Sequence, residues 1–314
     1  MIPPTNMSFD MEKTETSTVV RNDVSEVKRE TVAKYMRTQI NRNSKPLKEC
    51  KPEIISQFNA DYTDGKNSGY TGITCLPDGK ILLVDYINYT CRLYDQSSQH
   101  IADYIFASSP CDVCVIEGFQ VAVTFPENKS LQLLTVGNSI KPGKIINTNL
   151  RCYGIVALSG NQLVVSGRKK DSLYWCIVSI DGSVQLLVEV CHTIWSCSLA
   201  TNNSKTRIYV SCYRPSAVYV YGIDGTLIFI YTHDALDGAR GVAVDRDENM
   251  YVVGEKSANI HQVSPNGTPL HVFSTNIPKS PEAICFTCSG DKFVLMGDFL
   301  LMGDRRLVQI FEMI

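Results

Sequence analysis

The stretch that decides the fold runs from Gly238 to Ser274 and reads GARGVAVDRDENMYVVGEKSANIHQVSPNGTPLHVFS. It contains four short runs rich in β-branched and aromatic residues, at positions 241–244, 250–253, 260–263 and 270–273. The segments 247–249 and 265–267 separate these runs and carry the Asp, Asn and Gly residues that tight turns require. The pattern predicts four strands of an antiparallel sheet. A four-stranded sheet with two apolar faces needs further copies of itself on both sides.

Such copies occur along most of the chain. The first strand of each unit aligns at Gly72, Asp112, Gly154, Cys197, Gly241 and Ala283, with spacings of 40 to 44 residues. The units therefore begin near residues 69, 109, 151, 194, 238 and 280. A period of about 40 residues with four strands per unit is typical of a β-propeller. Six units predict an all-β fold with six blades.

The two ends of the repeat region predict how the ring closes. The last unit ends at Ile314, directly after its third strand. The segment 52–58, PEIISQF, resembles the fourth strand PLHVF at 269–273. We expect this N-terminal strand to pair with the last blade, because closure leaves no open edge between the first and last blades.

The composition changes near residue 50. Residues 1–50 are rich in Thr, Ser, Lys, Glu and Asn, with one weakly helical piece at 24–40. This segment is predicted to be a disordered polar linker, and a stub of coiled coil is the alternative. Residues 51–314 form the predicted propeller domain. We expect an oligomer only if a coiled coil exists upstream.

The composition also bounds the location of the protein. The 314 residues carry a formal net charge of −2, with no apolar run of membrane-spanning length and no secretory signal pattern. A cytoplasmic protein without membrane contact is expected, with its twelve cysteines reduced. Two Cys-x-x-Cys pairs occur, Cys111/Cys114 and Cys285/Cys288. Cys114 and Cys285 fall in predicted first strands, which favours small buried residues over a metal or redox role.

The sequences TGITCLPDGKILLVD and RGVAVDRDENMYVVGE resemble the NHL repeat. WD-repeat blades are disfavoured because no unit carries the Gly-His and Trp-Asp marks. The resemblance covers about residues 52–314, and the unit from Ala283 departs most. In that unit LMGD at 295–298 recurs at 301–304, which predicts a long loop between its second and third strands.

An NHL-type propeller behind a polar linker looks like the C-terminal part of tripartite-motif proteins. In that family a RING, zinc-binding B-boxes and a coiled coil precede the propeller, and the propeller selects the target for ubiquitination. Cys50 is the first cysteine here, so neither a RING nor a B-box precedes it in this sequence. The resemblance therefore implies recognition of a protein or peptide, with no catalysis by this chain.

The expected binding site lies on one face of the ring. In an antiparallel meander, the loops after the second and fourth strands share a face, which we call the loop-rich face. Tyr, Trp and Arg are enriched at binding hot spots, although such residues can also fill the central channel. The predicted binding residues are Tyr70, Tyr86, Tyr153, Arg168, Lys169, Trp195, Tyr213, Arg214, Arg240 and Glu282.

Two alternative functions remain open. Some NHL propellers bind single-stranded RNA, and the same residues stack bases or neutralise phosphates. Beyond residue 60, however, acidic residues exceed basic ones by four, which disfavours RNA. A metal-dependent propeller hydrolase is the second alternative. Only His192 and His233 precede first strands, and Asp112 and Glu282 are the candidate carboxylates, so no cofactor or metal is expected.

Overall fold

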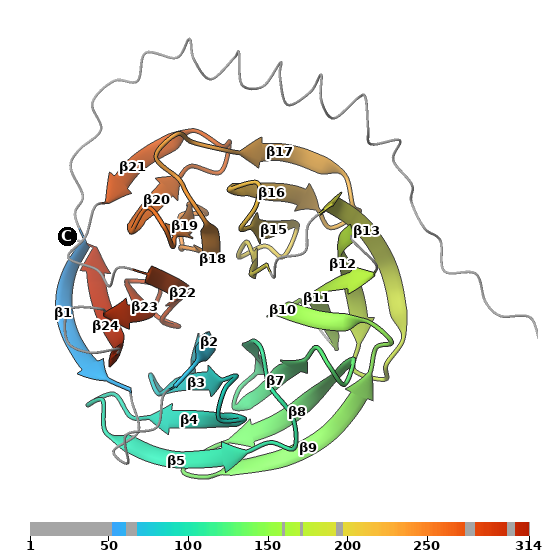
Figure 1. Cartoon of the computed structure of the whole chain (residues 1–314), viewed down its shortest axis with the longest axis vertical. Helices are drawn as coiled ribbons and strands as arrows, with labels where there is room; N and C mark the ends of the chain where they lie inside the picture. The colour runs from blue at the N-terminus through green and yellow to red at the C-terminus, as the bar shows by residue number, and fades with distance from the viewer. Residues whose placement is uncertain are drawn as a thin grey trace, which may run out of the picture.

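The computed structural model describes residues 52–60, 68–158, 161–169, 172–192, 197–273, 280–299 and 305–313. The predicted linker, residues 1–50, lies outside these ranges. The described residues form six four-stranded antiparallel sheets arranged around a central axis (Figure 1). The all-β fold and the count of six blades are confirmed.

The first three blades follow the chain in order. Blade 1 holds β2 (Tyr70–Cys75), β3 (Ile81–Asp85), β4 (Thr90–Tyr94) and β5 (His100–Ile105). Blade 2 holds β6 (Val113–Glu117), β7 (Gln120–Phe125), β8 (Ser130–Val136) and β9 (Ile140–Asn147). Blade 3 holds β10 (Arg151–Ala157), β11 (Gln162–Lys169), β12 (Ser172–Ser179) and β13 (Val184–His192).

The last three blades complete the ring. Blade 4 holds β14 (Leu199–Thr201), β15 (Arg207–Cys212), β16 (Ala217–Gly222) and β17 (Leu227–Tyr231). Blade 5 holds β18 (Ala239–Val244), β19 (Met250–Gly254), β20 (Asn259–Val263) and β21 (Pro269–Phe273). Blade 6 holds β22 (Ser280–Phe286), β23 (Lys292–Phe299), β24 (Arg305–Met313) and β1 (Pro52–Asn59).

Each blade begins at the axis and ends at the rim. Figure 1 places β2, β10, β18 and β22 near the centre, and β5, β9, β13 and β17 outside. The predicted Asp-Gly and Asn-Gly turns lie after the third strands of blades 3, 4 and 5. Their glycines Gly182, Gly225 and Gly267 have φ of 101°, 88° and 86°, a region that favours glycine.

The predicted closure of the ring is confirmed. β1 pairs antiparallel with β24, from Pro52 opposite Met313 to Asn59 opposite Leu307. The carbonyl of the next residue, Ala60, accepts hydrogen bonds from Tyr70 Oη at 2.6 Å and Arg92 Nη1 at 2.9 Å. The first strand of the chain therefore joins blade 6 and, through Ala60, is bound to blade 1.

The core lies between neighbouring blades. In blade 1 every residue of β3 and β4 is buried. Leu82 and Val84 of blade 1 pack in one cluster with Val121 and Val123 of blade 2. Both faces of each inner sheet are thus covered by a neighbour, which explains the continuous apolar runs in the second strands.

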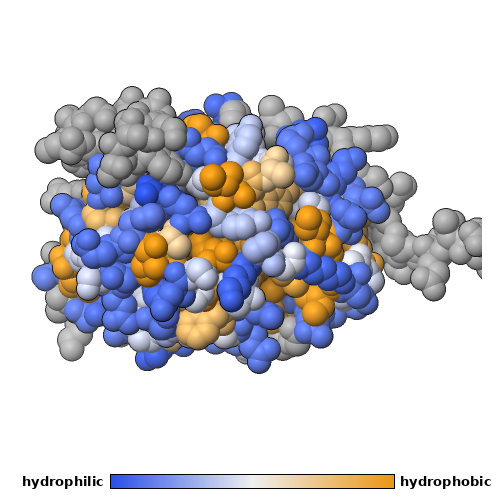
Figure 2. All heavy atoms as spheres, turned by 90° about the horizontal axis from the view of Figure 1, so that it is seen from below, coloured by the Kyte–Doolittle hydropathy of each residue, from blue (hydrophilic) through white to orange (hydrophobic). Residues whose placement is uncertain are grey.

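The rim is mixed in polarity. Figure 2 looks onto the side of the ring where β5 and β9 lie, and its apolar groups are scattered among polar ones. Ile105 on β5 and Ile145 on β9 are 75% and 59% exposed. Single exposed apolar residues are common on soluble proteins. No helix that is long and apolar enough to span a bilayer occurs in the described ranges.

The duplicated segment of blade 6 is partly described. Its first copy, 295–298, lies within β23, which extends to Phe299, and β24 begins at Arg305. The second copy, 301–304, lies outside the described residues. The expected long loop therefore stays a prediction.

We expect Phe58→Ala to destabilise the ring by about 2 kcal/mol, because Phe58 packs on Tyr94 of blade 1 with ring centroids 4.8 Å apart. The matched control is Ile55→Ala in the same strand, where Ile55 is 45% exposed and the cost should stay within about 0.5 kcal/mol. Urea unfolding measures both. Equal stability of the two variants would show that β1 does not hold blades 6 and 1 together.

Candidate functional site

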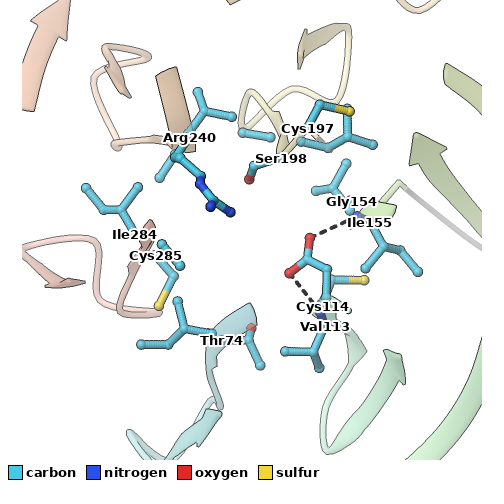
Figure 3. Close-up of a pocket in the computed structure, with 18 of the residues that line it drawn as sticks. Thr74, Val113, Cys114, Gly154, Ile155, Cys197, Ser198, Arg240, Ile284 and Cys285 are labelled. Carbon is cyan, nitrogen blue, oxygen red and sulfur yellow. Dashed lines mark hydrogen bonds between the residues drawn. The ribbon is translucent and has the colours of Figure 1, made fainter. Parts of the chain in front are cut away.

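The first strands of all six blades line a central channel. It holds a cavity of about 240 Å³, with residues from each blade on its wall. Figure 3 shows the Arg240 guanidinium pointing into this space from one side. A cavity of this size admits one side chain or one very small molecule.

Asp112 supplies a carboxyl group on the opposite wall, directly before β6. Its Oδ1 accepts a hydrogen bond from the Val113 amide at 2.8 Å, and its Oδ2 accepts one from the Ile155 amide of blade 3 at 3.1 Å (Figure 3). Burial raises the pKa of Asp112 to about 7, although the two amides favour the charged form. The carboxyl group is therefore held in place and titrates near neutral pH.

Hydroxyl groups in the second strands join consecutive blades below the loop-rich face. Thr124 Oγ1 accepts from the Asp112 amide at 2.9 Å and donates to the Tyr153 carbonyl of the next blade at 2.7 Å. Ser166 and Ser211 bond in the same way. Each hydroxyl accepts from an amide of its own blade and donates to a carbonyl of the next blade, that of Cys197 for Ser166 and that of Arg240 for Ser211. These bonds satisfy buried backbone groups where the blades converge.

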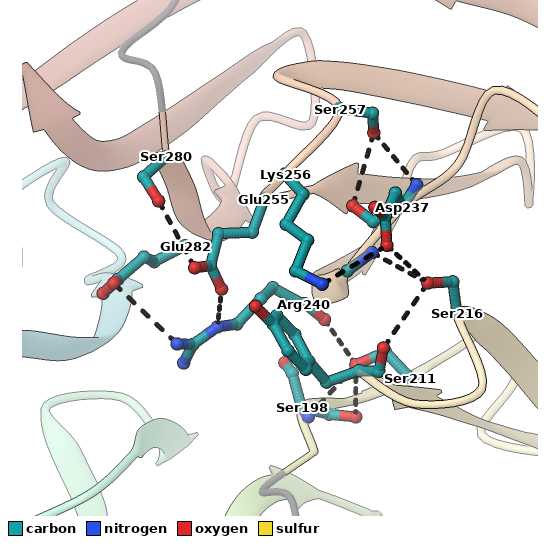
Figure 4. A network of polar contacts seen from close by, with 12 residues as sticks. Ser198, Ser211, Ser216, Asp237, Arg240, Glu255, Lys256, Ser257, Ser280 and Glu282 are labelled. Atoms are coloured by element: carbon teal, nitrogen blue, oxygen red, sulfur yellow. Dashed lines mark hydrogen bonds and ion pairs between the residues drawn. The ribbon is translucent and has the colours of Figure 1, made fainter.

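Four charged side chains from blades 5 and 6 form what we call the channel mouth: Arg240, Glu255, Glu282 and Arg306. Arg240 Nε lies 2.5 Å from Glu255 Oε2, and its Nη2 lies 3.9 Å from Glu282 Oε1 (Figure 4). Arg306 Nη1 lies 3.5 Å from Glu282 Oε2. Burial alone would lower the pKa of Arg240, but the carboxylates of Glu282 and Glu255 outweigh it and raise that pKa.

Tyr213 lies beside the channel mouth between two cations. The Arg240 guanidinium carbon is 5.5 Å from the centre of its ring, and Lys256 Nζ is 5.3 Å from it. Lys256 Nζ also lies 3.8 Å from Asp237 Oδ1. Both cations are within the range of cation–π attraction, which holds the Tyr213 ring in place.

The loop between β3 and β4 exposes three large apolar side chains on the loop-rich face. Tyr86, Ile87 and Tyr89 are 44%, 54% and 45% exposed. Asp85, which is fully buried, accepts hydrogen bonds from the amides of Gly69, Ile87 and Asn88 at 2.9–3.0 Å. We call residues 86–89 the apolar loop. The buried Asp85 carboxylate holds the backbone of this loop in place. A partner that binds its side chains would therefore lose little conformational entropy of the loop.

The predicted binding residues do not all reach the loop-rich face. Tyr70 is fully buried and its hydroxyl bonds to Ala60, so its assignment to the binding surface is wrong. Arg168 and Lys169 lie at the end of β11, next to that face, but in the strand and not in a loop, because β11 pairs with a long β12. Trp195 lies outside the described residues.

The remaining predicted residues lie on or near that face. Tyr86 and Arg214 are exposed, and Tyr153 and Tyr213 are half-buried. Arg240 and Glu282 were predicted as ligand contacts, and the structure brings them together as partners of one another. Their charges are thus largely balanced within the channel mouth.

Sequence reasoning missed several contributors. Ile87, Tyr89 and Lys205 were not singled out, nor were the bridging hydroxyls. The signals are visible in hindsight. Asp85 is followed by Tyr-Ile-Asn-Tyr, and a hydroxyl residue ends or nearly ends the second strand in three consecutive units.

The residues considered for a metal-dependent hydrolase are His192, His233, Asp112 and Glu282. Among the described residues no three His, Cys, Asp or Glu side chains are placed to hold a metal ion. The ring of His233 packs on that of His261 at 5.0 Å, away from Asp112. His192 is the last residue of β13, and its side chain is not among those that the structure describes.

The cysteines follow the strand pattern. Cys114 lies on β6 and Cys285 on β22, as predicted. The eleven cysteines in the described ranges are free thiols. Cys75 and Cys285 join blades 1 and 6 with their sulfurs 3.4 Å apart. Burial raises the pKa of the Cys114 thiol, which keeps it protonated and unreactive.

The comparisons with known proteins bear on the fold alone. No protein-family model and no curated protein sequence matches the chain. Virginiamycin B lyase from Staphylococcus aureus is similar in structure, with a TM-score of 0.59 and 13% identity over 85% of this chain and 100% of that one. A luciferin-regenerating enzyme gives 0.62 and 15% over 83% and 95%. The propeller domain of Myceliophteria thermophila Cps50 (Swd1) gives 0.58 and 11% over 77% and 83%.

These neighbours carry different names and, at 11–15% identity, show the fold alone, so the shared ring does not select an activity. A six-bladed propeller is a scaffold that supports binding in general. What distinguishes this chain must come from its own channel and loops.

We expect Thr124→Val to cost about 1–3 kcal/mol, because it keeps the shape of the side chain and leaves the Asp112 amide and the Tyr153 carbonyl unpaired. Thr135→Val on β8 is the matched control, since Thr135 is exposed and should lose less than about 0.5 kcal/mol. Chemical unfolding of both variants checks this. If Thr124→Val loses no more unfolding free energy than Thr135→Val, the hydrogen bonds of Thr124 do not stabilise the joint between blades 2 and 3.

Proposed function

We propose that this chain is a recognition module that binds a protein or peptide on its loop-rich face. The observation that carries the proposal is the apolar loop. Three large apolar side chains within four residues are exposed to water there, and exposed apolar groups that lie close together often mark a binding surface. Two tyrosines and an isoleucine offer the rigid, largely apolar contact area that is common at protein hot spots.

The geometry of the other loops supports the choice of blade 1. In blade 2 the equivalent loop carries Glu127 and Lys129 and is polar. In blade 5 it carries Glu255 and Lys256, which are engaged in ion pairs. The apolar loop therefore supplies the centre of the proposed contact, and Tyr153, Tyr213 and Arg214 lie on the same face around the channel.

Electrostatics favours a protein over the RNA alternative. Arg240 and Arg306 are each paired with carboxylates, so the channel mouth has too little net positive charge to attract a polyanion. The region beyond residue 60 carries four more acidic than basic residues. Phosphate binding releases counterions only when unpaired cations face the backbone.

The finer assignment rests on the NHL-type resemblance. We propose that the bound protein is selected as the tripartite-motif propellers select theirs, as a target for a ubiquitin ligase. In this case the ligase activity comes from a partner or a longer form. Without such a partner, the propeller would compete with ligases for the same target.

The test is crosslinking and immunoprecipitation from cells, read for both protein and RNA at two salt concentrations. Tyr86→Ala combined with Tyr89→Ala should reduce recovery of the protein partner at least tenfold, because hot-spot aromatics contribute about 2 kcal/mol or more. The fold should be retained, since both side chains are exposed.

Phe119→Ala is the matched control. Phe119 is 42% exposed in the turn between β6 and β7, on the opposite face. Its loss should leave recovery unchanged. If the double variant and Phe119→Ala recover the same amount of partner, the apolar loop is not the contact. If RNA is recovered and is lost at high salt, the RNA alternative is favoured.

A further inference from the structure

The channel contains charged groups that the proposed docking on the loop-rich face does not use. Within the part of the chain that the structure describes, Asp112 makes no ion pair, and its carboxylate oxygens accept hydrogen bonds from two backbone amides. Lys205 lies in the turn between β14 and β15, at the end of the channel opposite the mouth, and lines the same cavity. No carboxylate in the described ranges lies within ion-pair distance of its Nζ.

The positions of these groups along the channel follow from the strands. Asp112 directly precedes β6 and Arg240 is the second residue of β18, so both lie at the end of the channel where the first strands begin. Lys205 follows β14, so it lies at the end of the channel where the first strands finish.

Arg240 keeps donors available to the channel. Its Nε is occupied by Glu255, and its Nη2 is 3.9 Å from Glu282, beyond hydrogen-bond distance. The end of the guanidinium points into the cavity in Figure 3, toward the side where Val113 and Ile155 lie, whose amides bind the Asp112 carboxyl. An uncompensated acid and an available guanidinium on opposite walls suit a ligand that carries one cationic and one anionic group close together.

We propose that the channel binds a free α-amino acid, with its ammonium group at Asp112 and its carboxylate at Arg240. The side chain would extend along the channel past Thr74 and Cys114 toward Lys205. The cavity of about 240 Å³ is large enough for one amino acid and too small for a folded peptide. Lys205 at the far end favours a side chain that ends in an acceptor, such as that of glutamate or glutamine.

The ionisation of Asp112 should make the affinity of this site for an amino acid depend on pH. Burial raises the pKa of Asp112 to about 7, so the carboxyl is mostly protonated at pH 6 and mostly ionised at pH 8. Only the ionised form pairs with an ammonium group, and its fraction rises about tenfold between these pH values. The other charged groups that line the cavity are Arg240, Glu282 and Lys205, and burial lowers the pKa of Lys205. Affinity should therefore increase as the pH rises through 7.

The experiment is calorimetric titration of the full chain with each of the twenty L-amino acids at pH 6 and pH 8. We expect glutamate or glutamine to bind most tightly, with an affinity about tenfold higher at pH 8. The methyl ester and the N-acetyl derivative of the best ligand should each bind at least about tenfold more weakly, because each loses one charged contact. These derivatives test the site without altering the protein.

Paired variants test the protein side. Asp112→Asn and Arg240→Met should each abolish binding, whereas Asp224→Asn and Arg151→Met, at exposed positions outside the channel, should not. If Asp112→Asn does not fold, the ligand derivatives decide the question. The proposal is overturned if no amino acid binds, or if the ester and the N-acetyl derivative bind as well as the parent. Neither result bears on the apolar loop, which is tested separately.

Discussion

The antiparallel pairing of β1 with β24 is the contact on which the rest of the ring depends. Five blades are each made from one continuous segment, but blade 6 takes its outer strand from the start of the chain. The pairing runs over the whole of β1 and continues to Ala60, which binds Tyr70 and Arg92 of blade 1. Because each core cluster lies between two blades, an open ring would expose apolar faces on blades 1 and 6.

The six first strands converge at the axis, and this convergence limits which residues can stand there. Backbones approach closely there, and a Cβ added to Gly154 would lie 2.7 Å from the Cys197 carbonyl. Buried amides and carbonyls at this position need partners, and the hydroxyls of Thr124, Ser166 and Ser211 provide them. In blade 2 the Asp112 carboxylate also bridges to Ile155. One residue thus supports the joint between two blades and places a titratable group in the channel.

The loop-rich face divides into two regions with different chemistry. The channel mouth carries Arg240 and Arg306 balanced by Glu255 and Glu282, so it has little net charge. The apolar loop of blade 1 carries exposed Tyr and Ile side chains on a backbone that Asp85 fixes. A macromolecule and a small ligand could therefore bind without competing for the same atoms. The similar solved structures, at 11–15% identity, show the ring alone and assign no role to either region.

The sequence by itself determined the number of blades, the strand order and the closure by residues 52–58. These depend on local periodicity and turn chemistry, which repeat every 40 to 44 residues and can be read along the chain. Which side chains meet was decided only by the tertiary structure. Tyr70 resembled a surface aromatic but fills the joint to Ala60, and Arg240 and Glu282, 42 residues apart, neutralise each other. Contacts across blades depend on how far each strand extends and how it tilts, and a repeat pattern does not encode either.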